Sequence, residues 1–143
     1  MKRKKVILEI VETFAISAAV YLIISVVIAS IEVVWGASME PNFHTGERIL
    51  VDRLSKYVRE YTRGEVVVFY PPHDDSKHYI KRIVGIPGDI VKIFDCKVLI
   101  SRDGDKYVLD EYYLPQEECT SGGNKIIEGR SLRLEEDEYL LLG

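Results

Sequence analysis

Cysteine, histidine and runs of basic residues are scarce in this chain of 143 residues, and each scarcity excludes a class of function. Two cysteines and three histidines do not make a recognisable zinc site. After the first five residues the charges are mixed, so no basic nucleic-acid-binding face is expected. The length suits one domain, and a hydrophobic content of 47% is enough for a core. We therefore expect no metal, no cofactor and no nucleic acid as ligands.

A loop between two predicted strands is the place where a metal site is conceivable. There His73 and His78 flank Asp74 and Asp75. Their spacing is not one that is diagnostic of metal ligands. We interpret the loop as a solvated polar segment, and the isolated His44 in the same way.

Charge is absent from Thr13 to Ile31, between Glu12 and Glu32. A helix of this length would measure about 28 Å, close to the hydrocarbon thickness of a bilayer. A cleavable signal peptide is the alternative, because a basic start and an apolar core describe both. The run is long for a signal peptide, and Glu9 and Glu12 stand where signal peptides seldom carry acids. We therefore favour a membrane anchor.

The basic residues at the amino end give the anchor a direction. Lys2 to Lys5 are all basic, and the positive-inside rule keeps such a segment in the cytoplasm. This predicts a cytoplasmic N-terminus at residues 1–12, a transmembrane helix at residues 13–31 in the plasma membrane, and an extracytoplasmic domain at residues 32–143.

Cys96 and Cys119 would face an oxidising compartment in this topology. A bridge between them could stabilise a small domain, but the sequence does not show whether the geometry permits it. Neither cysteine has the neighbouring histidine and electropositive surroundings of a nucleophile. The pairing stays open at this point.

Beyond Trp35 the sequence predicts short strands separated by turns. The candidate strands are rich in β-branched and aromatic residues, and glycine, proline and aspartate lie between them. They are residues 48–53, 65–70, 79–85, 89–94, 97–100 and 138–143. We expect a mainly β fold, in which one N-terminal transmembrane helix precedes a barrel-like or sandwich arrangement of strands.

Ser38 lies in the stretch WGASMEP, just after the apolar span. A serine hydroxyl is a poor nucleophile until a base takes its proton, and the histidines here have no triad context. Lys81 in HYIKRIVG is the remaining candidate. Strand alternation places it on one face with Tyr79 and Ile83, where partial burial would lower its pKa. From the pattern alone, a linker serine and a lysine that reaches into solvent are the alternatives.

Four short elements occur in order in the first two thirds of the chain. They are Ser38–Met39–x–Pro41, GERILV at residues 46–51, RGEVVVF at residues 63–69 and YIKRIVGIPGD at residues 79–89. With the preceding apolar span, they make the chain similar to the bacterial type I signal peptidases, membrane-bound serine endopeptidases that remove signal peptides from exported proteins. The resemblance implies that Ser38 is the nucleophile and Lys81 its general base. The partners it implies are signal-peptide-bearing precursor proteins and the lipid bilayer.

The resemblance implies further site residues. The Ser38 backbone N–H would donate to the oxyanion. Apolar side chains would form the subsites for small residues before the cut, and shallow pockets of this kind accept alanine and exclude bulk. These residues are Met39, Tyr79 and Ile80, with Val34, Ile49 and Val68 as further wall residues, for which simple core packing is the alternative. Gly36, Pro41 and Arg82 are expected to support the site.

The sequence departs from the family pattern in two places. Gly36 stands where some members carry a serine hydroxyl that assists the oxyanion, which leaves a second donor unidentified. The late family element G-D-N-R-D-x-S is absent beyond Gly143, which corresponds to its first glycine. That element would supply partners for Lys81 and an acid for Arg82. We expect a truncated piece of a longer protein, rather than a chain that has lost catalytic support.

Two other functions stay open. A membrane-anchored module with the same fold could bind peptides without a competent dyad, and the incomplete late element is its support. The Ser/Lys self-cleaving repressors are a weaker alternative, because they need a DNA-binding domain. The leading hypothesis is a membrane-anchored serine endopeptidase that uses neither metal nor cofactor.

Overall fold

The computed structural model describes residues 2–71, 78–115, 118–122 and 126–143. The chain forms two compact units. Unit 1 consists of Met1–Val33 and Arg48–Glu60, and unit 2 consists of Val34–Glu47 and Tyr61–Gly143.

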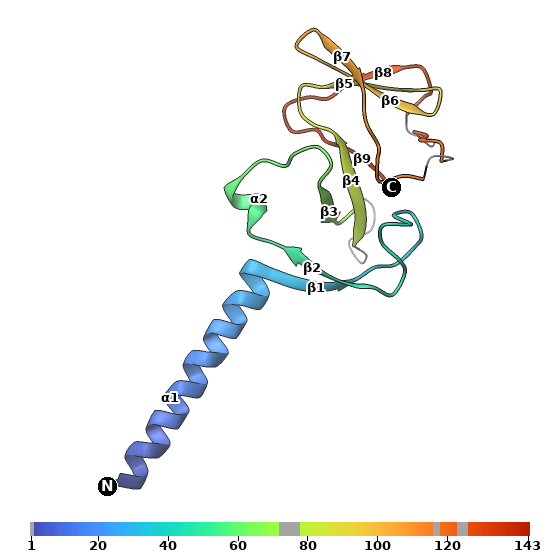
Figure 1. The fold of residues 1–143 in the computed structure, drawn as a ribbon. Helices are drawn as coiled ribbons and strands as arrows, with labels where there is room; N and C mark the ends of the chain where they lie inside the picture. Colours follow the sequence, from blue (N-terminus) through green and yellow to red (C-terminus); the bar gives the residue numbers. More distant parts are fainter. Residues whose placement is uncertain (1, 72–77, 116–117, 123–125) are drawn as a thin grey trace. The chain divides into compact units, whose positions relative to one another are not determined.

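Unit 1 contains the long apolar helix and a small sheet (Figure 1). Helix α1 (Lys2–Ile23) continues as a π-helix, η1 (Ile24–Ile28). Strand β1 (Ala29–Val33) then pairs antiparallel with β2 (Arg48–Asp52), and a short helix, α2 (Ser55–Val58), follows. The start of α2 is fixed by Asp52, whose Oδ1 accepts a hydrogen bond from the Ser55 N–H at 3.1 Å.

One helix of unit 1, from Arg3 to Ile28, is long and apolar enough to cross a membrane. It differs from the span expected at residues 13–31 at both ends. It begins earlier because the first residues are mostly lysine, glutamate, leucine and arginine, which favour helix. It stops at Ile28 because Ala29–Val33 forms strand β1 and pairs with β2, so that Ile31 faces Leu50.

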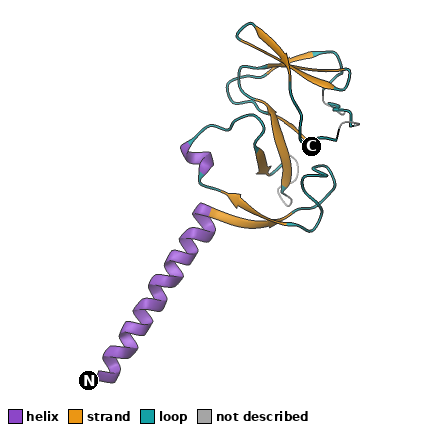
Figure 2. Cartoon of the chain, in the orientation of Figure 1, coloured by secondary structure: helices purple, strands orange, loops and turns teal. Residues whose placement is uncertain are grey.

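Unit 2 contains two antiparallel sheets (Figures 1 and 2). The first has the order β3-β4-β9, and the second has the order β7-β6-β5-β8. Their bounds are β3 Val66–Phe69, β4 Tyr79–Gly85, β5 Ile90–Phe94, β6 Lys97–Arg102, β7 Asp105–Val108, β8 Ser131–Arg133 and β9 Leu140–Leu142. The prediction of a mainly β fold after one N-terminal helix is confirmed.

The core of unit 2 lies on one face of the four-stranded sheet. Val91 and Ile93 of β5 pack with Val98 and Ile100 of β6, and Leu134 completes the cluster. Alternate residues of these strands are buried because successive side chains point to opposite faces. Burial of these branched side chains supplies the main driving force for the unit's folding.

The turn between β5 and β6 carries the disulfide. Asp95 and Cys96 both have positive φ, as the centre of a two-residue hairpin turn requires. Cys96 is bonded to Cys119, which answers the question that the sequence left open. The segment around Cys119 is therefore tied to the β5–β6 turn.

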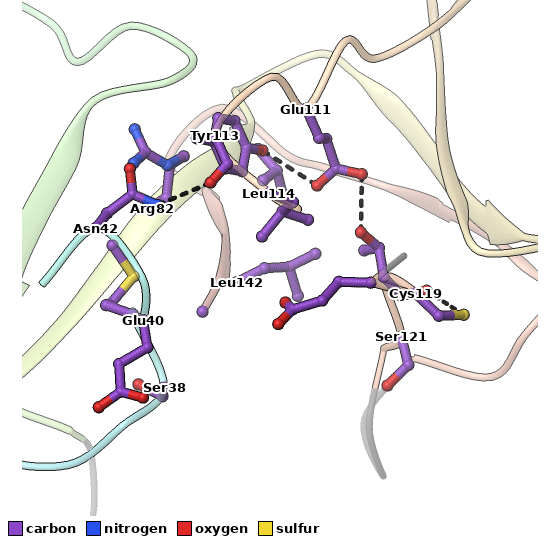
Figure 3. A pocket seen from close by; sticks show the side chains of 15 residues that line it. Ser38, Glu40, Asn42, Arg82, Glu111, Tyr113, Leu114, Cys119, Ser121 and Leu142 are labelled. Carbon is purple, nitrogen blue, oxygen red and sulfur yellow. Dashed lines mark hydrogen bonds between the residues drawn. The ribbon is translucent and has the colours of Figure 1, made fainter. Parts of the chain in front are cut away.

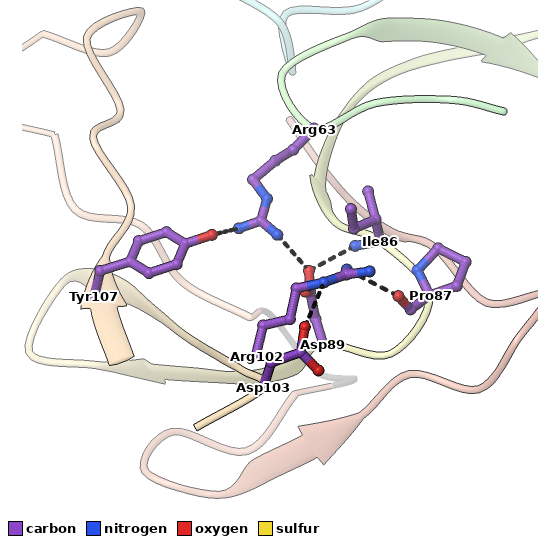
Figure 4. Close-up of polar contacts among 7 residues, drawn as sticks. All are labelled: Arg63, Ile86, Pro87, Asp89, Arg102, Asp103 and Tyr107. Carbon is purple, nitrogen blue, oxygen red and sulfur yellow. Dashed lines mark hydrogen bonds and ion pairs between the residues drawn. The ribbon is translucent and has the colours of Figure 1, made fainter. Parts of the chain in front are cut away.

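Asp89 is the centre of a buried ionic cluster in unit 2 (Figure 4). Its carboxylate is fully buried and accepts from Arg63 Nη2 at 2.7 Å and from Arg102 Nη1 at 3.1 Å. The Ile86 N–H donates to it as well, at 2.9 Å. These bonds join the segment before β3, the β4–β5 turn and β6, so one side chain connects the two sheets.

Candidate active site

Ser38 lies in a turn that follows Gly36. Gly36 has φ +95°, a backbone conformation that costs other residues strain, and its carbonyl accepts a bond from Thr45 Oγ1 at 3.0 Å. The backbone bonds that the described residues form here run from Glu40 N–H to Ala37 O and from Phe43 N–H to Met39 O. Neither bond uses the Ser38 N–H.

Lys81 extends from the central strand of the three-stranded sheet to the same place. Its Nζ donates to Ser38 Oγ at 2.9 Å and to the Gly143 carbonyl at 2.6 Å. Lys81 lies opposite Val67 of β3 in the strand register. The structure thus brings together the two residues that the sequence paired as nucleophile and base.

The surroundings of Lys81 change its proton affinity. The side chain is half-buried, and this desolvation lowers its pKa below the ordinary value of a lysine. The acceptors around its Nζ are the Ser38 hydroxyl and the main-chain oxygen of Gly143. The setting therefore favours the neutral amine more than water does.

Gly143 approaches Ser38, Met39 and Lys81 closely enough to exclude a side chain. A Cβ added there would lie 2.5 Å from Met39 Sδ and 3.2 Å from the Ser38 carbonyl oxygen. Glycine allows the backbone to bring its carbonyl to the lysine. Sequence reasoning treated this residue only as the start of a family element.

A pocket of about 240 Å³ opens beside Ser38 (Figure 3). Met39, Arg82 and Leu142 line it on the side of Ser38 and the sheet. The other lining residues include Glu111, Tyr113 and Leu114 and residues 118–121. Its lining includes polar and charged groups as well as apolar ones. The pocket meets the face of β4 that carries Arg82 and Val84, whereas Lys81 extends from the opposite face.

The predicted subsite residues are distributed unevenly around this site. Met39 is buried and lines the pocket. The others do not belong to its lining: Val34 and Ile80 are buried, Val68 is half-buried opposite Ile80, Tyr79 is exposed beside Phe69, and Ile49 lies in β2 of unit 1. Their role in binding substrate stays a prediction.

The residues expected to support the site have identifiable contacts. Arg82 Nη1 donates to the Gly64 carbonyl at 2.7 Å, and its guanidinium lies 4.1 Å from the centre of the Tyr113 ring. Pro41 follows a cis peptide bond in the turn that contains Ser38. Tyr113 and Glu111 were not singled out from the sequence, since EYYLPQEECT has no periodic pattern and no known motif spacing, and Asn42 was not because it lies just beyond the Ser38–Met39–x–Pro41 element.

The two described histidines, His44 and His78, have contacts away from Ser38 and Lys81. His44 contacts Glu47 in its own turn, at 3.4 Å, and His78 packs its ring against Tyr70. His73, Asp74 and Asp75 lie outside the described residues. Within the described part of the chain, no three histidine, cysteine, aspartate or glutamate side chains are grouped in a way that could hold a metal ion.

The sequence matches known proteins over nearly its whole length. The family described as signal peptidase, peptidase S26, matches residues 7–143. Signal peptidase I S of Bacillus subtilis (strain 168) is 39% identical over 114 residues, which cover 80% of this chain and 58% of the relative. Signal peptidase I of Bacillus licheniformis is 31% identical over 144 residues, covering 99% of this chain and 75% of the relative.

A third relative gives a similar picture. Signal peptidase I of Bacillus amyloliquefaciens is 33% identical over 99 residues, covering 69% of this chain. The match spans 52% of that relative and 58% of the Bacillus subtilis protein, so the chain corresponds to part of their length. The family match nevertheless includes both Ser38 and Lys81. The chain belongs to the signal peptidase family, peptidase S26.

Proposed function

We propose that the chain is a membrane-anchored serine endopeptidase that removes signal peptides from exported precursor proteins. The observation that carries the proposal is the 2.9 Å contact between Lys81 Nζ and Ser38 Oγ in a member of the signal peptidase family. The contact is direct, so no histidine is needed between nucleophile and base.

The first half of the reaction forms an acyl-enzyme. The neutral Lys81 amine accepts the Ser38 proton while Oγ attacks the carbonyl carbon before the scissile bond. The Ser38 N–H, in the turn of the nucleophile, donates to the oxyanion that develops. When the carbon–nitrogen bond breaks, the Lys81 ammonium gives its proton to the leaving amine.

The second half restores the enzyme. Lys81, neutral again, accepts a proton from a water molecule as the water oxygen attacks the ester carbonyl. The bond to Ser38 Oγ breaks, and the proton returns from Lys81 to the serine. The Gly143 carbonyl, 2.6 Å from Nζ, holds the amine in place through both halves. This sequence of steps uses only groups of the chain, the peptide and water.

Substrate selection in this proposal depends on small apolar subsites. Met39, Tyr79 and Ile80 receive the small side chains before the cut, and Val34 and Val68 pack behind them. Val68 lies opposite Ile80 in the β3–β4 register, which supports a continuous apolar wall. Such a wall accepts methyl groups and rejects larger ones by overlap.

The helix from Arg3 to Ile28 would anchor the enzyme where its substrates emerge. The basic residues Lys2 to Lys5 at its amino end favour a cytoplasmic N-terminus, with the catalytic unit on the outer face of the plasma membrane. Anchoring raises the effective concentration of membrane-delivered precursors without any new contact.

The test is cleavage of a purified precursor with an Ala-X-Ala site by the detergent-solubilised chain. Ser38→Ala and Lys81→Arg should abolish cleavage while the fold is retained, because alanine has no nucleophile and a guanidinium stays charged. Cleavage that continues in either variant would contradict the dyad. Saturable binding of the signal peptide without any cleavage by the wild type would favour the non-catalytic binding module.

A further inference from the structure

Ser38 and Lys81 reach one another from separate segments. Lys81 belongs to β4, whereas Ser38 lies in a turn outside the strands. A catalytic pair must be held within about half an ångström of its productive geometry, so something has to fix this turn against β4. The single hydrogen bond between Lys81 and Ser38 is not enough to hold the turn in place.

Tyr113 contacts both segments at once (Figure 3). Its main-chain carbonyl accepts a hydrogen bond from Asn42 Nδ2 at 2.8 Å, and Asn42 belongs to the nucleophile turn. Its ring lies against Arg82, 4.1 Å from ring centre to guanidinium carbon. Arg82 is the neighbour of Lys81 on β4, and its other contact, with the Gly64 carbonyl, keeps its head group in place.

The position of Tyr113 is itself fixed by a chain of bonds. Its hydroxyl donates to Glu111 Oε1 at 3.1 Å, and Glu111 Oε2 accepts from Thr120 Oγ1 at 2.8 Å. Thr120 follows Cys119, which the disulfide ties to Cys96. Burial and the nearby Glu111 carboxylate raise the pKa of Tyr113, so the hydroxyl stays protonated and remains a donor. Tyr113 is therefore held at both its main-chain carbonyl and its hydroxyl.

We propose that Tyr113 is a positioning residue of the dyad, which holds the turn of Ser38 against the strand of Lys81 through Asn42 and Arg82. This role rests on the proposed function. Tyr113 need not touch the peptide, because its effect reaches the reacting atoms through the two neighbours. Loss of the tyrosine would let the turn and the strand shift relative to one another.

The expected effect is on the chemical step. A displacement of about 1 Å at a catalytic pair can cost on the order of 100-fold in rate. Tyr113→Ala should therefore lower kcat by about that factor and change KM by less than about threefold. Asn42→Ala should lower kcat in the same way, and the double variant should be no slower than Tyr113→Ala, because the two changes interrupt one connection.

Two further variants separate positioning from folding. Tyr113→Phe loses the bond to Glu111 but keeps the two contacts that join the segments, the ring over Arg82 and the carbonyl for Asn42, so its kcat should stay within about threefold of the wild type. Tyr57→Ala removes a tyrosine of α2 in unit 1, which is 72% exposed, and should leave kcat unchanged. Thermal unfolding of every variant is measured first, so that rates are compared at a temperature at which all are folded.

The experiment uses the full chain in detergent with two readouts. One is cleavage of a fluorogenic Ala-X-Ala peptide, and the other is acylation of Ser38 by an activated p-nitrophenyl ester, located by mass spectrometry. In the second, Ser38 Oγ forms the ester bond, p-nitrophenolate leaves and Lys81 takes the proton. Slower kcat and slower acylation in Tyr113→Ala and Asn42→Ala, with normal rates in Tyr113→Phe, are the expected result.

Other outcomes would overturn the proposal. Folded Tyr113→Ala and Asn42→Ala with kcat near the wild type would show that no positioning is needed, and a rise in KM alone would indicate a substrate contact instead. If Tyr113→Ala does not fold, Asn42→Ala decides, because Asn42 is exposed. A wild type that cuts no peptide but is acylated at Ser38 would contradict the proposed function alone. A wild type that is not acylated would overturn both proposals.

Discussion

The Lys81 amine donates a 2.9 Å hydrogen bond to the Ser38 hydroxyl across 43 positions of the sequence. The lysine is half-buried, and its other hydrogen-bond acceptor is the main-chain oxygen of Gly143. A partly desolvated amine beside a hydroxyl is suited to accept a proton, because burial penalises the ammonium form.

The pH dependence of cleavage should report this burial. Lys81 must be neutral to act as base, so kcat/KM should rise with pH through the Lys81 pKa. Because burial lowers that pKa, the rise should lie below the ordinary lysine value of about 10.4. The measurement is kcat/KM from about pH 6 to about pH 11. A profile that rises only at or above the ordinary value would contradict the role.

The same shift predicts a pH-dependent stability. The unfolded chain binds the Lys81 proton more tightly than the folded protein, so the free energy of unfolding should increase as pH rises from the folded to the unfolded pKa. Lys81→Met, which has a side chain of similar length and no charge, should lack this contribution. Urea unfolding of both proteins at matched pH values measures the difference, and identical pH profiles would speak against a lowered pKa.

Met39→Trp should abolish cleavage of Ala-X-Ala substrates. Met39 is buried and its sulfur faces Gly143, so an indole would have to displace the backbone beside Ser38 or fill the adjoining pocket. Met39→Leu conserves the volume and is the matched control, expected to keep most of the activity. Peptide cleavage by both variants is the measurement. Equal activity of the tryptophan and leucine variants would show that this position does not shape the site.

Asp89→Ala should destabilise unit 2 strongly. It removes a fully buried carboxylate that pairs with Arg63 and Arg102, and the loss of one partner of a buried ion pair costs about 3–5 kcal/mol. Asp103→Ala is the control, because Asp103 contacts the same Arg102 from an exposed position and should contribute at most about 1 kcal/mol. Equilibrium urea unfolding gives both values. Similar small losses in the two variants would show that the cluster is not a main support of the unit.

Removal of the disulfide should lower the stability of the region around Cys119. The bond between Cys96 and Cys119 closes a loop with a sequence separation of 23. The loop-closure entropy of such a bridge corresponds to about 3 kcal/mol. Unfolding of a Cys96→Ala, Cys119→Ala double variant, compared with the oxidised wild type, tests this. An unchanged transition would mean that other contacts hold the segment without the bridge.

Local patterns predicted many of the elements. Strand β4 was predicted at its observed bounds, residues 79–85, because its β-branched and aromatic residues lie between clear turn signals. Strands β7 and β8 were not predicted, since their four and three residues are exposed and show no alternation in burial. Strand β1 was taken for the end of the apolar span, because an apolar run fits a helix as well as a strand until its pairing partner is known.

Candidate residues could be proposed from the sequence only where a motif carried them. Ser38 and Lys81 lie in elements that resemble a known family. Tyr113 and Asn42 lie in no such element, and the bond between them joins residues 71 positions apart. A contact between residues so far apart forms only when the fold brings their two segments together, and local sequence patterns carry no information about that.

The sequence by itself determined the apolar span, most of the strands and the pairing of Ser38 with Lys81 as candidates. These follow from hydrophobic runs, alternation and motif order, which are properties of neighbouring residues. Only the tertiary structure decided that Cys96 forms a disulfide with Cys119 and that Asp89 forms ion pairs with two arginines. It also decided that Tyr113 contacts both the turn of Ser38 and the strand of Lys81. The physical reason is that these contacts form when distant segments pack together, and their geometry is set by the packing of both sheets.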